Sequence, residues 1–180
     1  VLAETPATAG RGAGRGPAGP PQPPSLERLS PALDALIDPA AKIEHIVTEG
    51  FAWAEGPVWI GGADGYLLIS DPRLNNIFRW DSRGGLTTWL EPSGLQTPAD
   101  PKIYREAGTN GLFLGRGGII AADSGTRAIV RIDIATKQRT VLADRFQGKR
   151  LNSPNDLVVS PTTGMIYFTD PPFGLRQRDD

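Results

Sequence analysis

The chain has 180 residues, of which 39% are hydrophobic, a formal net charge of −1 and no cysteine. This length allows one ordinary domain, and the absence of cysteine excludes disulfides, thiolate metal sites and a cysteine nucleophile. The near-neutral charge, without a run of Lys and Arg, predicts no nucleic-acid partner. No stretch approaches the roughly 18 apolar residues that a membrane span requires, so no membrane span is predicted.

Residues 1–45 are predicted to form an N-terminal tail with one short helix. Residues 7–24 consist of Ala, Gly, Pro, Arg, Thr and Gln without apolar periodicity, which is typical of a disordered tail or linker. Residues 1–3, Val-Leu-Ala, look like the cleavage end of an export signal. They predict a periplasmic or secreted protein. A chance match in an Ala-rich terminus, and hence a cytoplasmic protein, is the alternative.

Two further elements are predicted before the main domain. Ser30 followed by Pro31 fits an N-cap with proline at the first helical position, which predicts a short amphipathic helix through Leu36. Alternating apolar residues in the range 43–47 predict a strand that leads into the domain. The domain itself is predicted to occupy residues 46–180.

Three similar stretches follow one another, at residues 55–81, 110–133 and 155–170. Each opens with a polar residue, continues in short apolar strands and includes a strand that ends in aspartate. A spacing of about 45 to 55 residues with several short strands per unit is typical of propeller blades. The sequence therefore predicts an all-β fold, a β-propeller of which this chain supplies about three blades.

Glycine-rich and polar segments separate the strands of each stretch. They predict hairpin turns at residues 61–65, 83–85, 115–118 and 161–164. Residues 132–142 give the clearest hairpin, predicted to be the outer strand pair of the second blade.

The polar residues that open the three stretches are the strongest candidates for a site. Equivalent positions in successive blades converge on the central channel of a propeller, so Glu55, Asn110 and Asn155 are expected to lie close together. Carboxylate and carboxamide oxygens suit Ca²⁺, Mg²⁺ or Mn²⁺, while Zn²⁺ and Fe²⁺ are further possibilities. Each residue alone could be an exposed turn residue. Three in register favour a site.

Other conspicuous residues are given structural roles. Asp71, Asp123 and Asp170 close strands ahead of loops and are predicted to cap turns by accepting backbone hydrogen bonds. The single histidine, His45, is more typical of a surface or packed residue, and one histidine without cysteine nearly excludes a Ser-His-Asp triad or an imidazole metal cluster. The tryptophans are interpreted as blade packing, although Trp53 could also form the wall of a ligand pocket.

Several motifs resemble the SMP-30/gluconolactonase/LRE-like family, over about residues 47–175. The most specific part is the run from Arg150 to Asp156 together with Thr-Asp-Pro-Pro at 169–172. The remaining motifs lie at residues 55–59, 70–71, 110–112, 143–149 and 173–175.

The resemblance implies a six-bladed propeller that hydrolyses a sugar lactone, such as gluconolactone, to the aldonic acid. One divalent metal ion in the channel would polarise the lactone carbonyl for attack by water. Glu55 would be a metal ligand, and Asn155 would lie beside the metal and contact substrate. Asn110 would point into the same channel, with Asn152 and Arg150 as further substrate-binding candidates.

The same resemblance implies that further metal ligands, an Asn and an Asp that also serves as catalytic base, come from later blades. The C-terminal half of the propeller would therefore be needed to complete the site. The metal could be Ca, Mn, Mg, Zn or Fe. Residues 123–125 depart from the many relatives that carry a histidine in this loop. The alternatives are a broader lactone and aryl-ester hydrolase and a non-catalytic, ligand-binding propeller.

Overall fold

The computed structural model describes residues 26–62 and 64–176, and the chain divides into two compact units, Val1–Thr48 and Glu49–Asp180. In the first unit the 3₁₀ helix η1 (Pro31–Ala35) confirms the predicted short helix. The Ser30 hydroxyl caps it by accepting a hydrogen bond from the backbone N–H of Ala32 at 3.2 Å. None of its residues is buried. The predictions for residues 1–24 lie outside the described residues.

The strand predicted at residues 43–47 was wrong, because this segment has no regular structure. Alternation of apolar residues produces a strand only where a neighbouring strand takes up the backbone hydrogen bonds. No described strand pairs with these residues. Ile43 and Ile46 accordingly remain 48% and 45% exposed. The described residues also include no helix long and apolar enough to cross a membrane.

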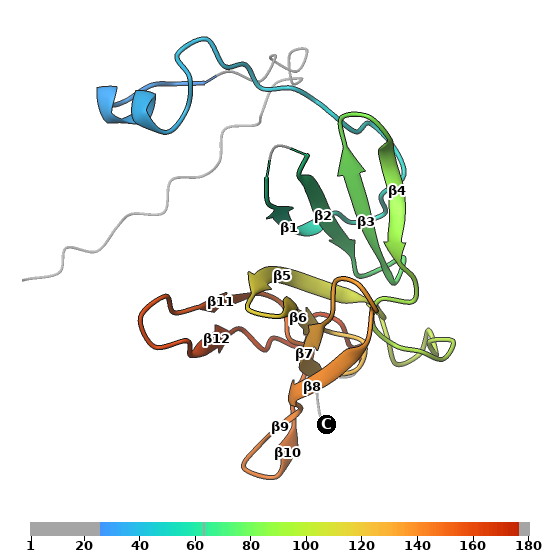
Figure 1. Ribbon diagram of the computed structural model, residues 1–180. Helices are drawn as coiled ribbons and strands as arrows, with labels where there is room; N and C mark the ends of the chain where they lie inside the picture. Colours follow the sequence, from blue (N-terminus) through green and yellow to red (C-terminus); the bar gives the residue numbers. More distant parts are fainter. Residues whose placement is uncertain (1–25, 63, 177–180) are drawn as a thin grey trace, which may run out of the picture. The chain divides into compact units, whose positions relative to one another are not determined.

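Two four-stranded antiparallel sheets form the centre of the second unit (Figure 1). The strands of the first sheet, in spatial as well as chain order, are β1 (Glu55–Ile60), β2 (Tyr66–Asp71), β3 (Asn76–Asp81) and β4 (Gly85–Leu90). The strands of the second sheet, again in both spatial and chain order, are β5 (Thr109–Gly115), β6 (Gly118–Asp123), β7 (Ala128–Ile132) and β8 (Arg139–Ala143). The hairpin predicted at residues 132–142 is confirmed as the join of β7 and β8.

Two smaller hairpins complete the unit. β11 (Leu157–Val159) pairs with β12 (Ile166–Phe168), and these are the strands of the third predicted stretch. β9 (Arg145–Phe146) pairs with β10 (Lys149–Arg150), a hairpin that the sequence did not predict. Two four-stranded blades followed by a two-stranded third confirm the all-β propeller architecture with about three blades.

The second blade is packed on both faces, and β6 shows why. All six residues of β6 are buried, and consecutive side chains of a strand point to opposite faces of the sheet. Ile119 and Ala121 belong to a core cluster that includes Leu68 and Ile77 of the first blade. Ile120 and Ala122 belong to a second cluster. The β11–β12 hairpin packs against this cluster with Leu157, Val159 and Ile166. The uninterrupted apolar run of β6 is the sequence counterpart of this two-sided burial.

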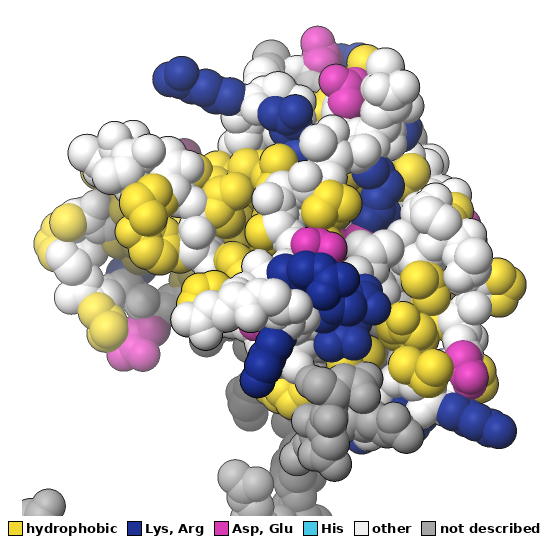
Figure 2. All heavy atoms as spheres, turned by 90° about the horizontal axis from the view of Figure 1, so that it is seen from below, with side chains coloured by type: hydrophobic (Ala, Val, Ile, Leu, Met, Phe, Trp, Pro, Cys, Tyr) yellow, Lys and Arg dark blue, Asp and Glu magenta, His cyan; other side chains and the backbone are white. Residues whose placement is uncertain are grey.

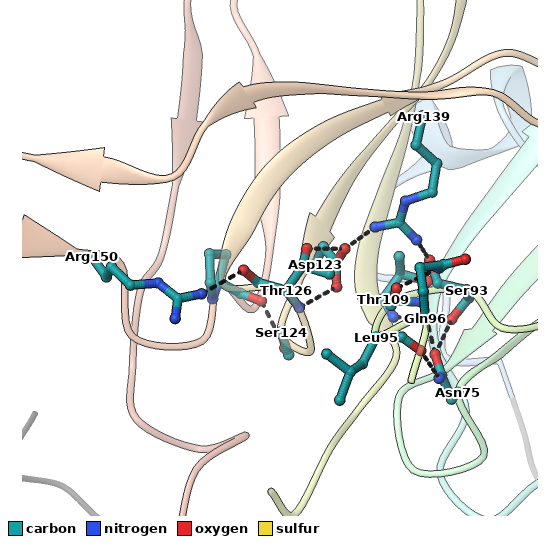
Figure 3. A network of polar contacts seen from close by, with 12 residues as sticks. Asn75, Ser93, Leu95, Gln96, Thr109, Asp123, Ser124, Thr126, Arg139 and Arg150 are labelled. Atoms are coloured by element: carbon teal, nitrogen blue, oxygen red, sulfur yellow. Dashed lines mark hydrogen bonds and ion pairs between the residues drawn. The ribbon is translucent and has the colours of Figure 1, made fainter. Parts of the chain in front are cut away.

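A network of buried polar groups joins the second blade to the loop that follows β4 (Figure 3). The Asp123 carboxylate is fully buried, accepts a hydrogen bond from the backbone N–H of Thr126 at 3.0 Å and forms an ion pair with Arg139. The Arg139 guanidinium also donates to the backbone carbonyl of Ser93. Asp123 therefore caps its own turn, as predicted, and links two blades.

Candidate functional site

Asp71 positions two side chains of the site. Its Oδ2 accepts hydrogen bonds from the backbone N–H groups of Ala52 and Trp53 at 2.7 and 2.9 Å, and its Oδ1 accepts from those of Arg73 and Leu74 at 3.1 and 3.0 Å. Asp71 is fully buried. The predicted turn-capping role is confirmed, and the same four bonds hold the backbone of Trp53 and Arg73 in place.

Asp170 holds the corresponding upstream segment in the third blade, but its Oδ1 is buried without a hydrogen-bond partner among the described residues, so the turn capping predicted for it is not observed. Its Oδ2 accepts a hydrogen bond from the backbone N–H of Asn152 at 2.8 Å, and its backbone carbonyl accepts from the Asn152 carboxamide at 3.3 Å. The backbone N–H of Asn155 donates to the carbonyl of Thr169 at 3.0 Å. These bonds fix the segment that carries Asn155 into β11.

The opening residues of the three blades are brought together by two glycines. A Cβ atom at Gly56, whose φ is +49°, would lie 2.4 Å from the backbone oxygen of Asn110, and one at Gly111 would lie 2.8 Å from the Cα of Asp156. The N–H of Gly111 donates to the carbonyl of Asn155 at 2.7 Å. Only residues without a side chain permit this approach. The starts of β1 and β5 and the segment leading into β11 therefore lie side by side.

A pocket of about 370 Å³ opens beside these strand starts. Its lining residues come from five separate parts of the chain and are Trp53, Glu55, Arg73, Arg105, Glu106, Asn155 and Phe173. Two of the predicted site residues, Glu55 and Asn155, are thus brought into one pocket although they are far apart in sequence. Trp53 lines it as well, in line with the alternative role considered for this tryptophan.

The Glu55 carboxylate is oriented by its neighbour Trp53. The indole Nε1 of Trp53 donates a hydrogen bond to Glu55 Oε1 at 2.8 Å. The Arg73 guanidinium lies over the Trp53 ring, 4.2 Å from its centroid, a distance at which a cation is attracted to the ring face. Since Asp71 fixes the backbone of both Trp53 and Arg73, the four residues form one supported unit with Glu55 at its end.

Asn110 lies behind the pocket. It is only 2% exposed and is not among the lining residues. Its backbone carbonyl accepts a hydrogen bond from the Ser70 hydroxyl, and its side chain lies near enough to Glu106, which does line the pocket, to lower the pKa of the Glu106 carboxyl. Of the three residues in register, two therefore reach the pocket directly and the third reaches it through Glu106.

Sequence reasoning missed Glu106. This residue is 9% exposed, and its Oε2 is buried without a hydrogen-bond partner. Burial raises the pKa of its carboxyl, and the negative charge of Glu55 raises it further, whereas Arg73 and the hydrogen bond from Asn110 lower it. Glu106 has no counterpart at the same place in the other two stretches, so the repeat pattern gave no signal for it.

Two predicted substrate-binding residues do not line the pocket. Arg150 is exposed on β10, and its Nη2 donates to the backbone carbonyl of Thr126 at 3.1 Å (Figure 3). The Asn152 carboxamide donates to the backbone of Asp170. In this structure both side chains are engaged with backbone carbonyls of their own surroundings.

The pocket residues fit part of an oxygen-ligated metal site. Glu55 and Asn155 offer carboxylate and carboxamide oxygens, the ligands that Ca²⁺ and Mg²⁺ prefer, and the pocket has room for an ion with its waters. The part of the chain that the structure describes holds no group of three or more His, Cys, Asp or Glu side chains that could bind a metal ion. By its chemistry Glu55 is suited to be one ligand of such an ion, with Asn155 in the same pocket beside it.

Comparisons with known proteins agree with this architecture. The protein-family model of the SMP-30/gluconolactonase/LRE-like region matches residues 53–180. A gluconolactonase of Zymomonas mobilis subsp. mobilis is 45% identical over 156 residues, which are 86% of this chain and 43% of the relative. A solved gluconolactonase of Xanthomonas campestris is 37% identical with a TM-score of 0.56, over 71% of this chain and 38% of that one.

A further solved structure, a gluconolactonase-like protein, is 34% identical with a TM-score of 0.58, over 71% of this chain and 39% of that one. The chain thus spans less than half the length of the relatives that it matches. The family model covers more than two thirds of the chain, in the same blades that carry the pocket. The chain belongs to the SMP-30/gluconolactonase/LRE-like family.

Proposed function

We propose that the complete protein is a lactonase that hydrolyses a sugar lactone of the gluconolactone type to the aldonic acid. The observation that carries this proposal is the meeting of Glu55 and Asn155 in one pocket. These residues come from two different blades, in a chain that is 45% identical to a gluconolactonase. A pocket with aromatic walls and a few convergent polar groups suits a small polar ligand.

Within this proposal Glu55 holds a divalent metal ion and Asn155 lies beside it. When bound, the metal supplies Lewis-acid polarisation of the lactone carbonyl. The Trp53 N–H keeps the Glu55 carboxylate turned to one side of the pocket, with 2.8 Å between Nε1 and Oε1. The Asn155 carboxamide can both donate to and accept from a ring hydroxyl, which suits it to orient the sugar.

Later blades would provide the remaining metal ligands and the aspartate that acts as catalytic base. Hydrophobic side chains left exposed on the blades are consistent with such a contribution, and Figure 2 shows several of them on one face. In the β11–β12 hairpin Val158 and Tyr167 are 55% and 56% exposed. Further blades would cover surfaces of this kind.

We also propose a periplasmic or secreted location for the protein, on the basis of residues 1–3.

The substrate class is tested by comparing two esters with the complete protein. We expect glucono-1,5-lactone to be opened well above its spontaneous rate, with a kcat/KM at least about 10-fold higher than that for phenyl acetate. Equal values would favour the broader lactone and aryl-ester hydrolase. No acceleration of either reaction would contradict the lactonase proposal and favour a ligand-binding propeller.

A further inference from the structure

We propose that Glu106 is a substrate-binding residue that accepts a hydrogen bond from a hydroxyl group of a polyhydroxylated ligand. The inference rests on the proposed function in one respect, namely that the ligand is a sugar lactone. It adds to the site a residue from the segment just before β5, which neither the repeat pattern nor the family motifs had indicated.

The Glu106 carboxylate has incomplete hydrogen bonding. Glu106 is 9% exposed and lines the same pocket as Glu55 and Asn155, yet its Oε2 has no hydrogen-bond partner. A buried polar atom without a partner is costly, and most of all when it belongs to a carboxylate. An acidic group kept in such a place is expected to find its donor in the ligand that fills the pocket.

The groups around Glu106 indicate which kind of donor it would take. The positive charge of Arg73 and the Asn110 side chain already act on Glu106, since each lowers the pKa of its carboxyl. The Arg73 charge already offsets that of the Glu106 carboxylate, so no further cation is needed there, whereas a hydroxyl group is neutral and needs only one free acceptor. The surroundings of Glu106 therefore favour an O–H donor over a second cation.

The pocket around Glu106 has aromatic as well as polar walls. Trp53 and Phe173 contribute aromatic rings to its lining and are 48% and 61% exposed, with Arg73 over one face of the Trp53 ring. A sugar ring has C–H groups on its faces and hydroxyls at its edge. Aromatic faces together with a hydrogen-bond acceptor match that distribution of polar and apolar groups.

The test is the variant Glu106→Gln in the complete protein, assayed with two lactones. Glucono-1,5-lactone carries ring hydroxyls, and δ-valerolactone has the same ring without them. We expect kcat/KM for glucono-1,5-lactone to fall roughly 10- to 100-fold, because a neutral carboxamide oxygen replaces the charged acceptor and an NH₂ group replaces the other carboxylate oxygen. For δ-valerolactone we expect a change below about 2-fold. An equal loss on both lactones, or no loss on either, would overturn the proposal.

Two further measurements separate this role from others. Divalent-metal affinity measured by calorimetry should be the same in wild type and Glu106→Gln, and a large loss would make Glu106 a metal ligand instead. The melting temperature should be unchanged or higher, because the variant removes a buried charge; a clear drop would indicate a structural role and overturn the proposal. Glu44→Gln, the same change at an exposed position, is the matched control.

The outcome also remains informative if the proposed function fails. Should the wild type open neither lactone, the lactonase proposal falls, and the binding of gluconate by calorimetry decides on Glu106. Weaker binding of gluconate to Glu106→Gln, again by roughly 10- to 100-fold, would support the role of Glu106 as a hydroxyl acceptor. Equal binding to both proteins, or no binding to the wild type, would overturn it.

Discussion

Replacing Glu55 with glutamine is expected to lower the affinity for a divalent cation by more than about 100-fold, since losing only an outer partner of a metal ligand costs 10- to 100-fold. Glutamine keeps the size of the side chain and the oxygen that accepts from Trp53 Nε1, but it removes the negative charge. Calorimetric titration of the chelator-treated complete protein with Ca²⁺ and with Mn²⁺ measures the effect. Unchanged metal binding would rule out Glu55 as a ligand.

The blades should be unaffected by this substitution. Glu55 is only partly buried and its pairing with Ser70 in the sheet runs through the backbone. The melting temperature of Glu55→Gln should therefore stay close to that of the wild type. Glu44→Gln again serves as control, because it makes the same chemical change at an exposed residue and should leave metal affinity unaltered.

The largest loss of stability is expected from Arg139→Ala. The Asp123 carboxylate is fully buried, and Arg139 is its ion-pair partner (Figure 3). Breaking a buried pair by removing one member leaves a buried charge without compensation, which costs about 3–5 kcal/mol of unfolding free energy. Urea denaturation measures the difference. A loss below about 1 kcal/mol would show that the pair behaves like an exposed one.

Two features make this prediction specific to the ion pair. Arg131→Ala changes an exposed arginine of the same blade and should alter the unfolding free energy by no more than about 0.5 kcal/mol. Removing both charges, in Asp123→Asn with Arg139→Ala, should recover part of the loss, because no unpaired charge then remains. A double variant as unstable as Arg139→Ala alone would argue against a purely electrostatic cause.

The loss of unfolding free energy in Arg139→Ala should depend on pH in a defined direction. Burial raises the pKa of Asp123, while Arg139 and the hydrogen bonds from Thr126 oppose this rise. A carboxyl with a raised pKa binds its proton more tightly in the folded state, so stability falls as the pH rises through that pKa. Removing Arg139 raises the pKa of Asp123 further, because the positive charge that lowers it is lost. The deficit of Arg139→Ala should therefore be largest at neutral pH and shrink in acid.

The blades could be predicted from the sequence because their signals are local. Turn glycines at residues 61–65 and 115–118 mark hairpins, and the apolar run of β6 marks a strand buried on both faces. At the strand ends, Asp71 and Asp123 mark capped turns. β9 and β10 escaped prediction since two-residue strands are too short to show a period. The segment 43–47 shows the converse error, an alternating pattern without a hydrogen-bonded neighbour.

The site was predictable only as far as the repeat reaches. Register placed Glu55 and Asn155 correctly in one pocket, and it placed Asn110 next to that pocket. Glu106 depends instead on long-range backbone contacts. The N–H of Arg105 donates to the carbonyl of Gly174 at 2.8 Å, and the N–H of Ala107 donates to that of Pro72 at 2.9 Å. Contacts between three blades set its position, and no local pattern encodes them.

Whether the protein is a metal-dependent lactonase is decided by the rate of glucono-1,5-lactone opening in three states of the complete protein: as isolated, after treatment with a chelator, and after a divalent ion is restored. We predict a rate well above the spontaneous one, its loss on chelation, and its recovery with at least one of Ca²⁺, Mn²⁺, Mg²⁺, Zn²⁺ or Fe²⁺. A full rate that survives chelation, or no acceleration with any of these ions, would contradict a metal-dependent lactonase built on Glu55 and Asn155.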